Sequence, residues 1–302
     1  MSTTSVAVAN VQTADRWRLG MRIYRARGSA RGAVLCGHAM MTDGRYFDKP
    51  VGEGFATWLA RQGFDVFVPD FRGHGLSGPG AEAGARWSFD ELVKYDWPAL
   101  RAAAADASCC SAADLCVIGH SLGGLVVAAD AVRSGFQARR TVFLSANVWN
   151  LRAMSLVEAM KARGLLSMLS VMPRLGRPVP VRRLGIGTAD EAPQYIRQFV
   201  DWCQSGRFES LDGMDYRAAL PVWRRAAVAV VGQGDWMCTE QGAGRFLGSS
   251  PSIPLAVEGP SSGLSFAPDH FSLLTRQPGN EWHRRLADFL DSGLYEGART
   301  LL

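Results

Sequence analysis

Lysine is scarce in this chain. Only Lys49, Lys94 and Lys161 occur among 302 residues, so arginine supplies almost all of the positive charge behind the formal net charge of +5. The arginines are scattered apart from short pairs such as Arg139-Arg140, whereas a protein that binds nucleic acid presents them as a basic stripe. We therefore interpret these charges as a solvated surface and expect no nucleic-acid partner.

Cysteine pairs and long apolar runs are also missing. The six cysteines have no CxxC spacing and form no cluster with histidine at the spacing of zinc ligands, so we expect reduced thiols and no bound metal. No window approaches the roughly 18 apolar residues that span a bilayer, and residues 1–10 lack the basic and apolar regions of a secretory signal. These absences predict a cytoplasmic protein without stable membrane insertion. The cysteines are Cys36, Cys109, Cys110, Cys116, Cys203 and Cys238.

The most informative stretch that is present is the pentapeptide Gly119-His120-Ser121-Leu122-Gly123. A short apolar segment with the composition of a buried strand precedes it, and a plausible helix follows it. Glycine on either side of the serine leaves no Cβ in the way of a sharp turn from strand to helix. The serine hydroxyl is therefore expected at the edge of the sheet, above a helix N-terminus.

Strands alternate with helices along most of the chain, which predicts a parallel sheet covered by helices on both faces. The alternation stops at residues 149–220, where helical pieces, loops and several methionines follow one another. We therefore predict an α/β fold with a core domain at residues 1–148 and 221–302 and a helical insertion at residues 149–220. After a hairpin at 11–27, strands are predicted at 32–38, 65–69, 115–118, 141–144, 227–231 and 253–257, and helices at 47–62, 89–105 (with Ser88 and Glu91 as a capping box), 124–132, 239–247 and 281–290.

A serine hydroxyl is a poor nucleophile at neutral pH unless a base removes its proton and a third group orients that base. The base candidate is His270, because it follows the last predicted strand and precedes the last helix, whereas the other four histidines do not. The acid candidate is Asp235, which follows an apolar strand in a glycine-containing turn, with Asp269 and Glu240 as the alternatives. Ser121, Asp235 and His270 are therefore the predicted catalytic residues.

Acyl chemistry on a serine also needs two backbone N–H groups aimed at the oxygen that becomes negatively charged. One is expected from Leu122, directly after the serine, and the other from the loop after strand 32–38, where we select Met40. Trp236 and Met237, which directly follow the acid, are expected to line the substrate pocket. Methionines and leucines of the insertion suit an adaptable apolar pocket; the alternative is that they pack only the insertion's own core.

With these residues in place, the chain resembles the α/β-hydrolase superfamily along nearly its whole length. The order Ser121, Asp235, His270 is the order of that arrangement, and residues 70–78 (DFRGHGLSG) resemble the family's Asp-x-Arg-Gly-His-Gly-x-Ser loop. The resemblance implies the α/β-hydrolase fold, with a mostly parallel eight-stranded sheet, helices on both faces and a helical lid formed by the insertion.

One branch of bacterial predicted hydrolases is similar in further details. The insertion contains an Arg-Arg-Leu-Gly-x-Gly segment at residues 182–187 and the pair Trp202-Cys203, as in that branch. The chain departs from many relatives at His38-Ala39, where they have His-Gly before the residue that binds the oxyanion. A methyl group at this position limits positive φ and close approach of the backbone.

The leading hypothesis is a serine hydrolase that cleaves carboxylic esters, or thioesters, with an apolar acyl group. Ser121 attacks the acyl carbon, His270 transfers the proton, Asp235 orients the imidazole, and water then releases the acyl group. This mechanism requires no cofactor and no metal, and the partner is a small ester-type molecule.

Three alternatives are carried forward. The same residues could cleave amides, as in an aminopeptidase whose insertion holds a carboxylate for the substrate's amine, or they could transfer the acyl group to an acceptor other than water. A non-catalytic binding protein is the third alternative, although none of the three predicted catalytic residues is missing. No oligomeric state is predicted. The carboxylates available in the insertion are Glu158, Asp190, Glu191 and Asp201.

Overall fold

The computed structural model describes residues 6–248 and 250–300. The stretch that we interpret as lacking a secretory signal, residues 1–10, lies partly outside the described residues. Among the described residues, no helix is both long enough and apolar enough to cross a membrane.

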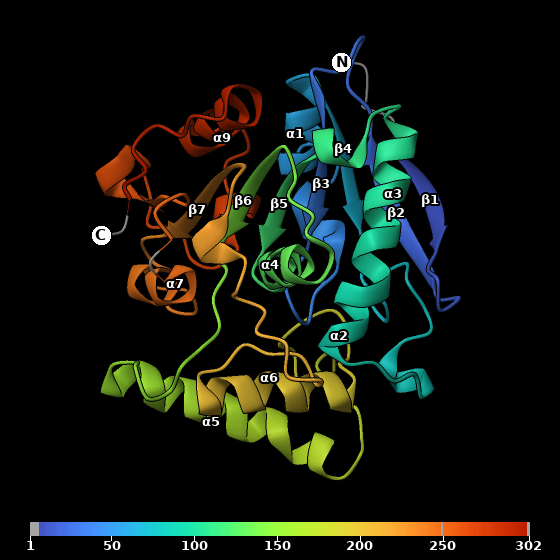
Figure 1. Ribbon diagram of the computed structural model, residues 1–302, viewed down its shortest axis with the longest axis vertical. Helices are drawn as coiled ribbons and strands as arrows, with labels where there is room; N and C mark the ends of the chain where they lie inside the picture. Colours follow the sequence, from blue (N-terminus) through green and yellow to red (C-terminus); the bar gives the residue numbers. More distant parts are fainter. Residues whose placement is uncertain (1–5, 249, 301–302) are drawn as a thin grey trace.

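Within the described residues, eight strands form one sheet in the order β1-β2-β4-β3-β5-β6-β7-β8. β2 runs antiparallel to β1 and β4, and all other neighbouring strands run parallel. The prediction of a mostly parallel eight-stranded sheet is therefore confirmed. The strands are β1 (Val6–Gln12), β2 (Arg18–Tyr24), β3 (Gly32–Gly37), β4 (Phe64–Pro69), β5 (Cys116–His120), β6 (Arg140–Leu144), β7 (Ala226–Gly232) and β8 (Leu255–Glu258), and most are labelled in Figure 1.

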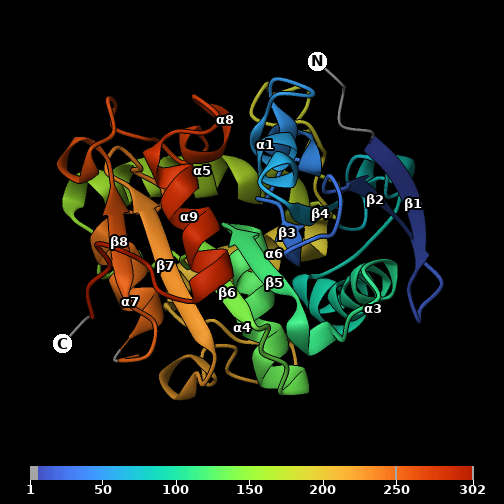
Figure 2. The same ribbon diagram turned by 90° about the horizontal axis from the view of Figure 1, so that it is seen from above.

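Two hydrophobic cores, one on each face of the sheet, hold the layers together. Successive residues of a strand point to opposite faces, so Leu35 of β3 packs into one core whereas Val34 and Cys36 pack into the other. The strands are almost continuously apolar because helices cover both faces. Helices α3 and α4 cover one face, and α1 and α9 cover the other (Figure 2). The helices of the core are α1 (Phe55–Arg61), α2 (Phe89–Glu91), α3 (Trp97–Ala107), α4 (Leu122–Ser134), α7 (Glu240–Leu247), α8 (Ser272–Thr275) and α9 (Glu281–Ser292).

The predicted hairpin is misplaced at its start. It was expected at residues 11–27, but β1 begins at Val6. β1 pairs only with β2 and forms an edge of the sheet, so its outward-facing Val6 and Val8 are 44% and 58% exposed. A strand at an edge lacks the burial on both faces that makes the central strands recognisable from their composition.

The helix predicted at residues 47–62 is wrong in its first half. A 3₁₀ turn at Gly44–Asp48 is followed by a loop, and α1 begins only at Phe55. Pro50 lacks the N–H that a continuing helix needs, and the Asp48 carboxylate closes the loop by accepting the N–H groups of Gly52 and Gly54. The apolar spacing that suggested one helix therefore belongs to two separate elements.

The helix predicted at residues 89–105 begins at the predicted cap, where the Glu91 carboxylate accepts the Ser88 N–H at 2.6 Å. It is irregular after that. α2 continues as a π-helical turn at Leu92–Asp96 before α3 begins at Trp97. The π turn ends two residues before Pro98, whose ring lacks the N–H that a regular helix would use at this position.

Residues 149–220 contain α5 (Leu156–Arg174) and α6 (Pro193–Ser205). The two helices contact each other and form a layer beyond one end of the sheet (Figure 1). Leu166 of α5 and Ile196 of α6 join the same core as α3 and α4. β6 and β7 pair directly with each other, so the segment between them packs onto the core without interrupting the sheet.

Candidate active site

Ser121 lies in the sharp turn between β5 and α4, with φ 52° and ψ −113°. The positive φ therefore falls on the serine and not on the flanking glycines. The glycines are needed for close packing, because a Cβ on Gly119 would lie 2.6 Å from the Gly124 Cα and a Cβ on Gly123 would lie 2.3 Å from the Gly37 carbonyl oxygen. The turn, β3 and α4 can approach one another only because these positions lack side chains.

Asp235 and His270 meet at the end of β7. Asp235 Oδ1 accepts the N–H groups of Met237 and Cys238, each at 2.9 Å, and Oδ2 lies 2.8 Å from His270 Nδ1. A carboxylate only accepts, so the hydrogen of the neutral imidazole is on Nδ1 and Nε2 keeps its lone pair. Nε2 is thus the nitrogen able to take a proton from a serine.

The two alternative acids have other partners. Asp269 Oδ1 accepts the N–H groups of Phe271 and Ser272 at 3.1 and 2.9 Å, which folds its own loop. Glu240 is in the first turn of α7 and pairs with Arg299. Of the three candidates, Asp235 is therefore the one whose carboxylate is hydrogen-bonded to the His270 ring in the described part of the chain.

Ser121 and His270 line one cavity of about 160 Å³ between the core and the insertion. Most of its wall is apolar: Leu165 and Leu169 come from α5, and Phe199 comes from α6. Among the described residues, no aspartate or glutamate lines this cavity. A molecule bound there would place an apolar group against the insertion and a reacting atom near the serine.

The two residues predicted to bind the oxyanion, Leu122 and Met40, both line this cavity. Leu122 is the first residue of α4, where backbone N–H groups have no acceptor within the helix. Among the hydrogen bonds of the described residues, neither the Leu122 nor the Met40 N–H has an acceptor, whereas the Met41 N–H donates to Glu191. Of the two neighbouring methionines, Met40 is therefore the one with an available N–H.

Alanine at position 39 is accommodated without positive φ. The left-handed residue of this loop is Met41, with φ 63°, two residues after the alanine. The Ala39 N–H donates to Tyr46 Oη at 2.9 Å, and the residue is buried. The departure from the glycine of many relatives therefore does not disturb the loop that contains Met40.

Tyr46 and His120 link this loop to His270, a connection that sequence reasoning missed. Tyr46 Oη lies 2.7 Å from His120 Nδ1, and His120 Nε2 lies 2.8 Å from the His270 carbonyl oxygen. The carbonyl only accepts, so Nε2 carries the hydrogen and Nδ1 accepts from the tyrosine hydroxyl. Burial and the neighbouring His270 hold the pKa of His120 well below its usual value, so its ring stays neutral. His120 directly precedes Ser121, and this position in the sequence pointed to a role near the serine. Nothing in the sequence pointed to Tyr46.

Trp236 does not line the cavity, contrary to the prediction. Its neighbour Met237 does, and so does Trp149, whose ring centroid lies 6.0 Å from that of Trp236. Trp236 is 39% exposed and also lies 5.8 Å from Lys161 Nζ. The Asp235 carboxylate turns the chain through its bonds to residues 237 and 238, which places the methionine and not the tryptophan at the cavity.

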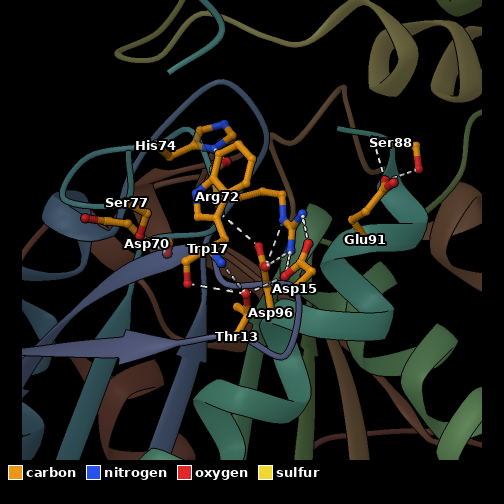
Figure 3. A network of polar contacts seen from close by, with 10 residues as sticks. All are labelled: Thr13, Asp15, Trp17, Asp70, Arg72, His74, Ser77, Ser88, Glu91 and Asp96. Carbon is orange, nitrogen blue, oxygen red and sulfur yellow. Dashed lines mark hydrogen bonds and ion pairs between the residues drawn. The ribbon is translucent and has the colours of Figure 1, made fainter. Parts of the chain in front are cut away.

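The Asp-x-Arg-Gly-His-Gly loop is held by the ion pairs of the buried Arg72 (Figure 3). Arg72 contacts Asp96 at 2.7 Å and Asp15 at 2.9 Å. Asp70 accepts the N–H of Gly44 at 2.6 Å and so joins this loop to the segment that follows Met41. The motif recognised in the sequence therefore supports the loop beside the cavity, and its residues do not line that cavity.

An eight-stranded sheet in this order, with a serine in the turn between β5 and α4, defines the α/β-hydrolase class. Comparison with known proteins supports this assignment to the α/β-hydrolase class. Residues 28–197 match the family described as serine aminopeptidase, S33. Because the match covers more than half of the chain, the protein belongs to this family of α/β hydrolases.

Individual relatives are more distant. Triacylglycerol lipase 2 of Arabidopsis thaliana is 31% identical over 147 residues, which is 46% of this chain and 34% of the lipase, so the chain spans about a third of that relative. An esterase of Pyrococcus furiosus has a TM-score of 0.61 at 18% identity, over 95% of this chain and 91% of its own. An esterase of Exiguobacterium antarcticum has a TM-score of 0.60 at 14% identity, over 94% and 99%. At these identities the solved structures show the shared fold.

Proposed function

We propose that this protein hydrolyses carboxylic esters or thioesters with an apolar acyl group, through an acyl-enzyme on Ser121. His270 Nε2 takes the serine proton as Oγ bonds to the acyl carbon, and the N–H groups of Leu122 and Met40 stabilise the oxyanion. The imidazolium gives the proton to the leaving group. Water, deprotonated by His270, then attacks the acyl carbon and frees Ser121. Asp235 holds the imidazole through its Nδ1 hydrogen throughout.

The apolar wall of the cavity is the observation that carries this proposal. Residues 149–220 act as a lid domain over the core formed by residues 1–148 and 221–302, and α5 and α6 supply the surface that contacts the acyl group. Burial of apolar surface contributes about 0.8 kcal/mol per methylene group, so these helices favour an alkyl chain over a short polar acyl group.

Amide cleavage from a free amino terminus is the second candidate, because the matching family is described as serine aminopeptidase. An aminopeptidase needs a carboxylate for the substrate's ammonium group. Glu191 and Asp190 are buried with other partners, Glu158 caps its own helix, and Asp201 lies in a different hollow from Ser121. The cavity therefore supports an ester in preference to an aminoacyl amide.

The test is a matched pair of substrates with the same acyl group, a p-nitrophenyl ester and a p-nitroanilide, assayed over a series of acyl lengths. The proposal predicts turnover of the ester, with kcat/KM rising as the acyl chain lengthens from acetyl. Preferential turnover of aminoacyl anilides with a free amine would favour the aminopeptidase instead.

A further inference from the structure

A buried carboxylate of the insertion contacts the loop that contains Met40. Glu191 follows the irregular segment after α5, and its side chain is fully buried. Its Oε1 accepts the N–H of Met41 at 2.7 Å, across 150 residues of sequence. Met41 also has φ 63°, a conformation that L residues rarely adopt. This carboxylate therefore holds a strained residue directly beside the candidate oxyanion donor.

His74 in turn holds Glu191. Its Nε2 lies 3.2 Å from Glu191 Oε1, and its Nδ1 lies 2.8 Å from the Arg72 carbonyl oxygen. Both ring nitrogens thus face groups that only accept, and both can donate only if the ring is the imidazolium. Burial opposes this charge, but Glu191 and, more weakly, Asp70 outweigh it and raise the pKa of His74 to about 9. The ring of His38 lies 5.1 Å away.

The same segment of the insertion also holds the other side of Met41. The N–H groups of Thr188 and Ala189 donate to the Met41 carbonyl oxygen at 2.8 and 3.2 Å. A Cβ on Gly187 would lie 2.2 Å from this oxygen. The N–H and the C=O of Met41 are therefore both bonded to residues that lie within the insertion.

We propose that Glu191 is a positioning residue for the oxyanion hole: by bonding the Met41 N–H it keeps the Met40 N–H directed at the cavity. This inference rests on the function proposed above. It follows that the oxyanion hole is assembled from the core and the insertion together, through the bonds that Thr188, Ala189 and Glu191 make to Met41. Glu191 acts through Met41 and contacts no reacting atom.

Two substitutions of Glu191 and one of the neighbouring Asp190 test this positioning role. Glu191→Gln keeps an oxygen acceptor for Met41, whereas Glu191→Leu removes it at similar volume. Loss of one oxyanion donor lowers kcat by about 100- to 1,000-fold, so a displaced donor should lower kcat by about 10- to 100-fold in Glu191→Leu with little change in KM. Asp190→Asn is the control, because Asp190 is also buried but bonds Arg182 and not the loop. It should retain wild-type kcat.

A transition-state analogue separates positioning from general damage. An alkyl trifluoromethyl ketone forms a tetrahedral oxyanion on the serine, so its Ki should rise by the same factor by which kcat/KM falls in Glu191→Leu. Glu191→Gln should keep most of the wild-type kcat and inhibitor affinity. The proposal is overturned if Glu191→Leu folds and keeps kcat, or if Glu191→Gln loses as much as Glu191→Leu.

A second variant covers the case in which Glu191→Leu does not fold, because it leaves the His74 imidazolium buried without its partner. Replacing both members of a buried ion pair by apolar groups is often tolerated, so His74→Leu/Glu191→Leu restores the fold while the Met41 N–H still lacks an acceptor. This double variant should also lose kcat, and wild-type kcat in it would overturn the proposal. Labelling by a fluorophosphonate distinguishes a failure of the proposed function from a failure of the role proposed for Glu191. A wild-type protein without a Ser121 adduct contradicts the proposed function, whereas a labelled wild type with a fully active Glu191→Leu contradicts only the role of Glu191.

Discussion

At the scale of single residues, Ser121 combines a backbone conformation suited to glycine with the side chain that the proposed reaction requires. Its φ of 52° and ψ of −113° lie outside the regions that L residues favour, and such a residue costs of the order of 1–3 kcal/mol. The turn is held by the bond from the Ser121 N–H to the Leu144 carbonyl oxygen at 2.8 Å and by the close glycine contacts. The protein thus keeps a less stable turn that directs the hydroxyl to the cavity.

This strain predicts a difference between two inactive variants. Ser121→Gly relieves the positive φ and should be more stable than Ser121→Ala by about 1 kcal/mol, after allowing for the greater chain entropy of glycine in the unfolded state. Urea denaturation of the two variants measures this difference directly. Equal stability, or a more stable alanine variant, would show that the turn carries no strain.

At the scale of elements, residues 149–220 supply one side of the cavity, with Leu165 and Leu169 from α5 and Phe199 from α6. Leu165 is half-buried and lines the cavity from α5, whereas Met168, three residues further along the same helix, is 40% exposed and does not line it. The two positions therefore allow the effect of the wall on substrate choice to be separated from the effect of a larger side chain on α5.

We expect Leu165→Trp to shorten the acyl chain that the enzyme accepts. Loss of space for one or two methylene groups is worth about 1–3 kcal/mol, so kcat/KM for long-chain p-nitrophenyl esters should fall by about tenfold while that for the acetate ester stays unchanged. Met168→Trp should leave the whole chain-length profile as in the wild type. A parallel fall for acetate and long-chain esters in Leu165→Trp would mean that α5 does not bind the acyl group.

At the scale of the whole molecule, the buried pair of His74 and Glu191 makes stability depend on pH. The pKa of His74 is raised to about 9 from an ordinary value of 6.5, because Glu191 outweighs the opposing effect of burial. A raised histidine pKa contributes stability that is fully present below about 6.5 and is lost as pH rises through about 9. The pKa values of His38, His120 and His283 are lowered by burial, so these rings are neutral throughout this window.

Between pH 7 and 8.5 the unfolded chain loses the His74 proton whereas the folded chain keeps it, so this pair alone should lower the free energy of unfolding by about 1 kcal/mol per pH unit. Urea denaturation at these pH values measures the slope. His74→Leu/Glu191→Leu removes the titrating pair but keeps the other buried histidines and the buried thiols, so the wild type should lose stability more steeply than this variant by about 1 kcal/mol per pH unit. Equal pH dependence in the two proteins would contradict the charged state of His74.

Much of the fold follows from local patterns, and the missing parts have physical reasons. Strands β3 to β7 were located to within about two residues because burial on both faces makes them continuously apolar. The start of β1 was not predicted, because β1 is an edge strand. The helix predicted at residues 47–62 was wrong in its first half, because its apolar spacing continues across the break at Pro50.

The candidate site was predictable where it depends on loops that follow strands. The expected contact of Asp235 with His270 is present, although the catalytic roles of these residues stay predictions. The contacts of Tyr46 with His120 and of His74 with Glu191 join residues 74 and 117 positions apart. No local pattern encodes such pairs, and Trp236 was misplaced because the turn made by Asp235 depends on side-chain hydrogen bonds.

The most direct measurement of the central claim is the turnover of a p-nitrophenyl ester with a medium-length alkyl chain by the wild type and by Ser121→Ala, with the same-acyl anilide alongside. The account predicts ester turnover in the wild type, little or none of the anilide, and loss of ester turnover by a factor of about 10³ or more in a folded Ser121→Ala variant. Equal ester turnover in the two proteins would contradict it.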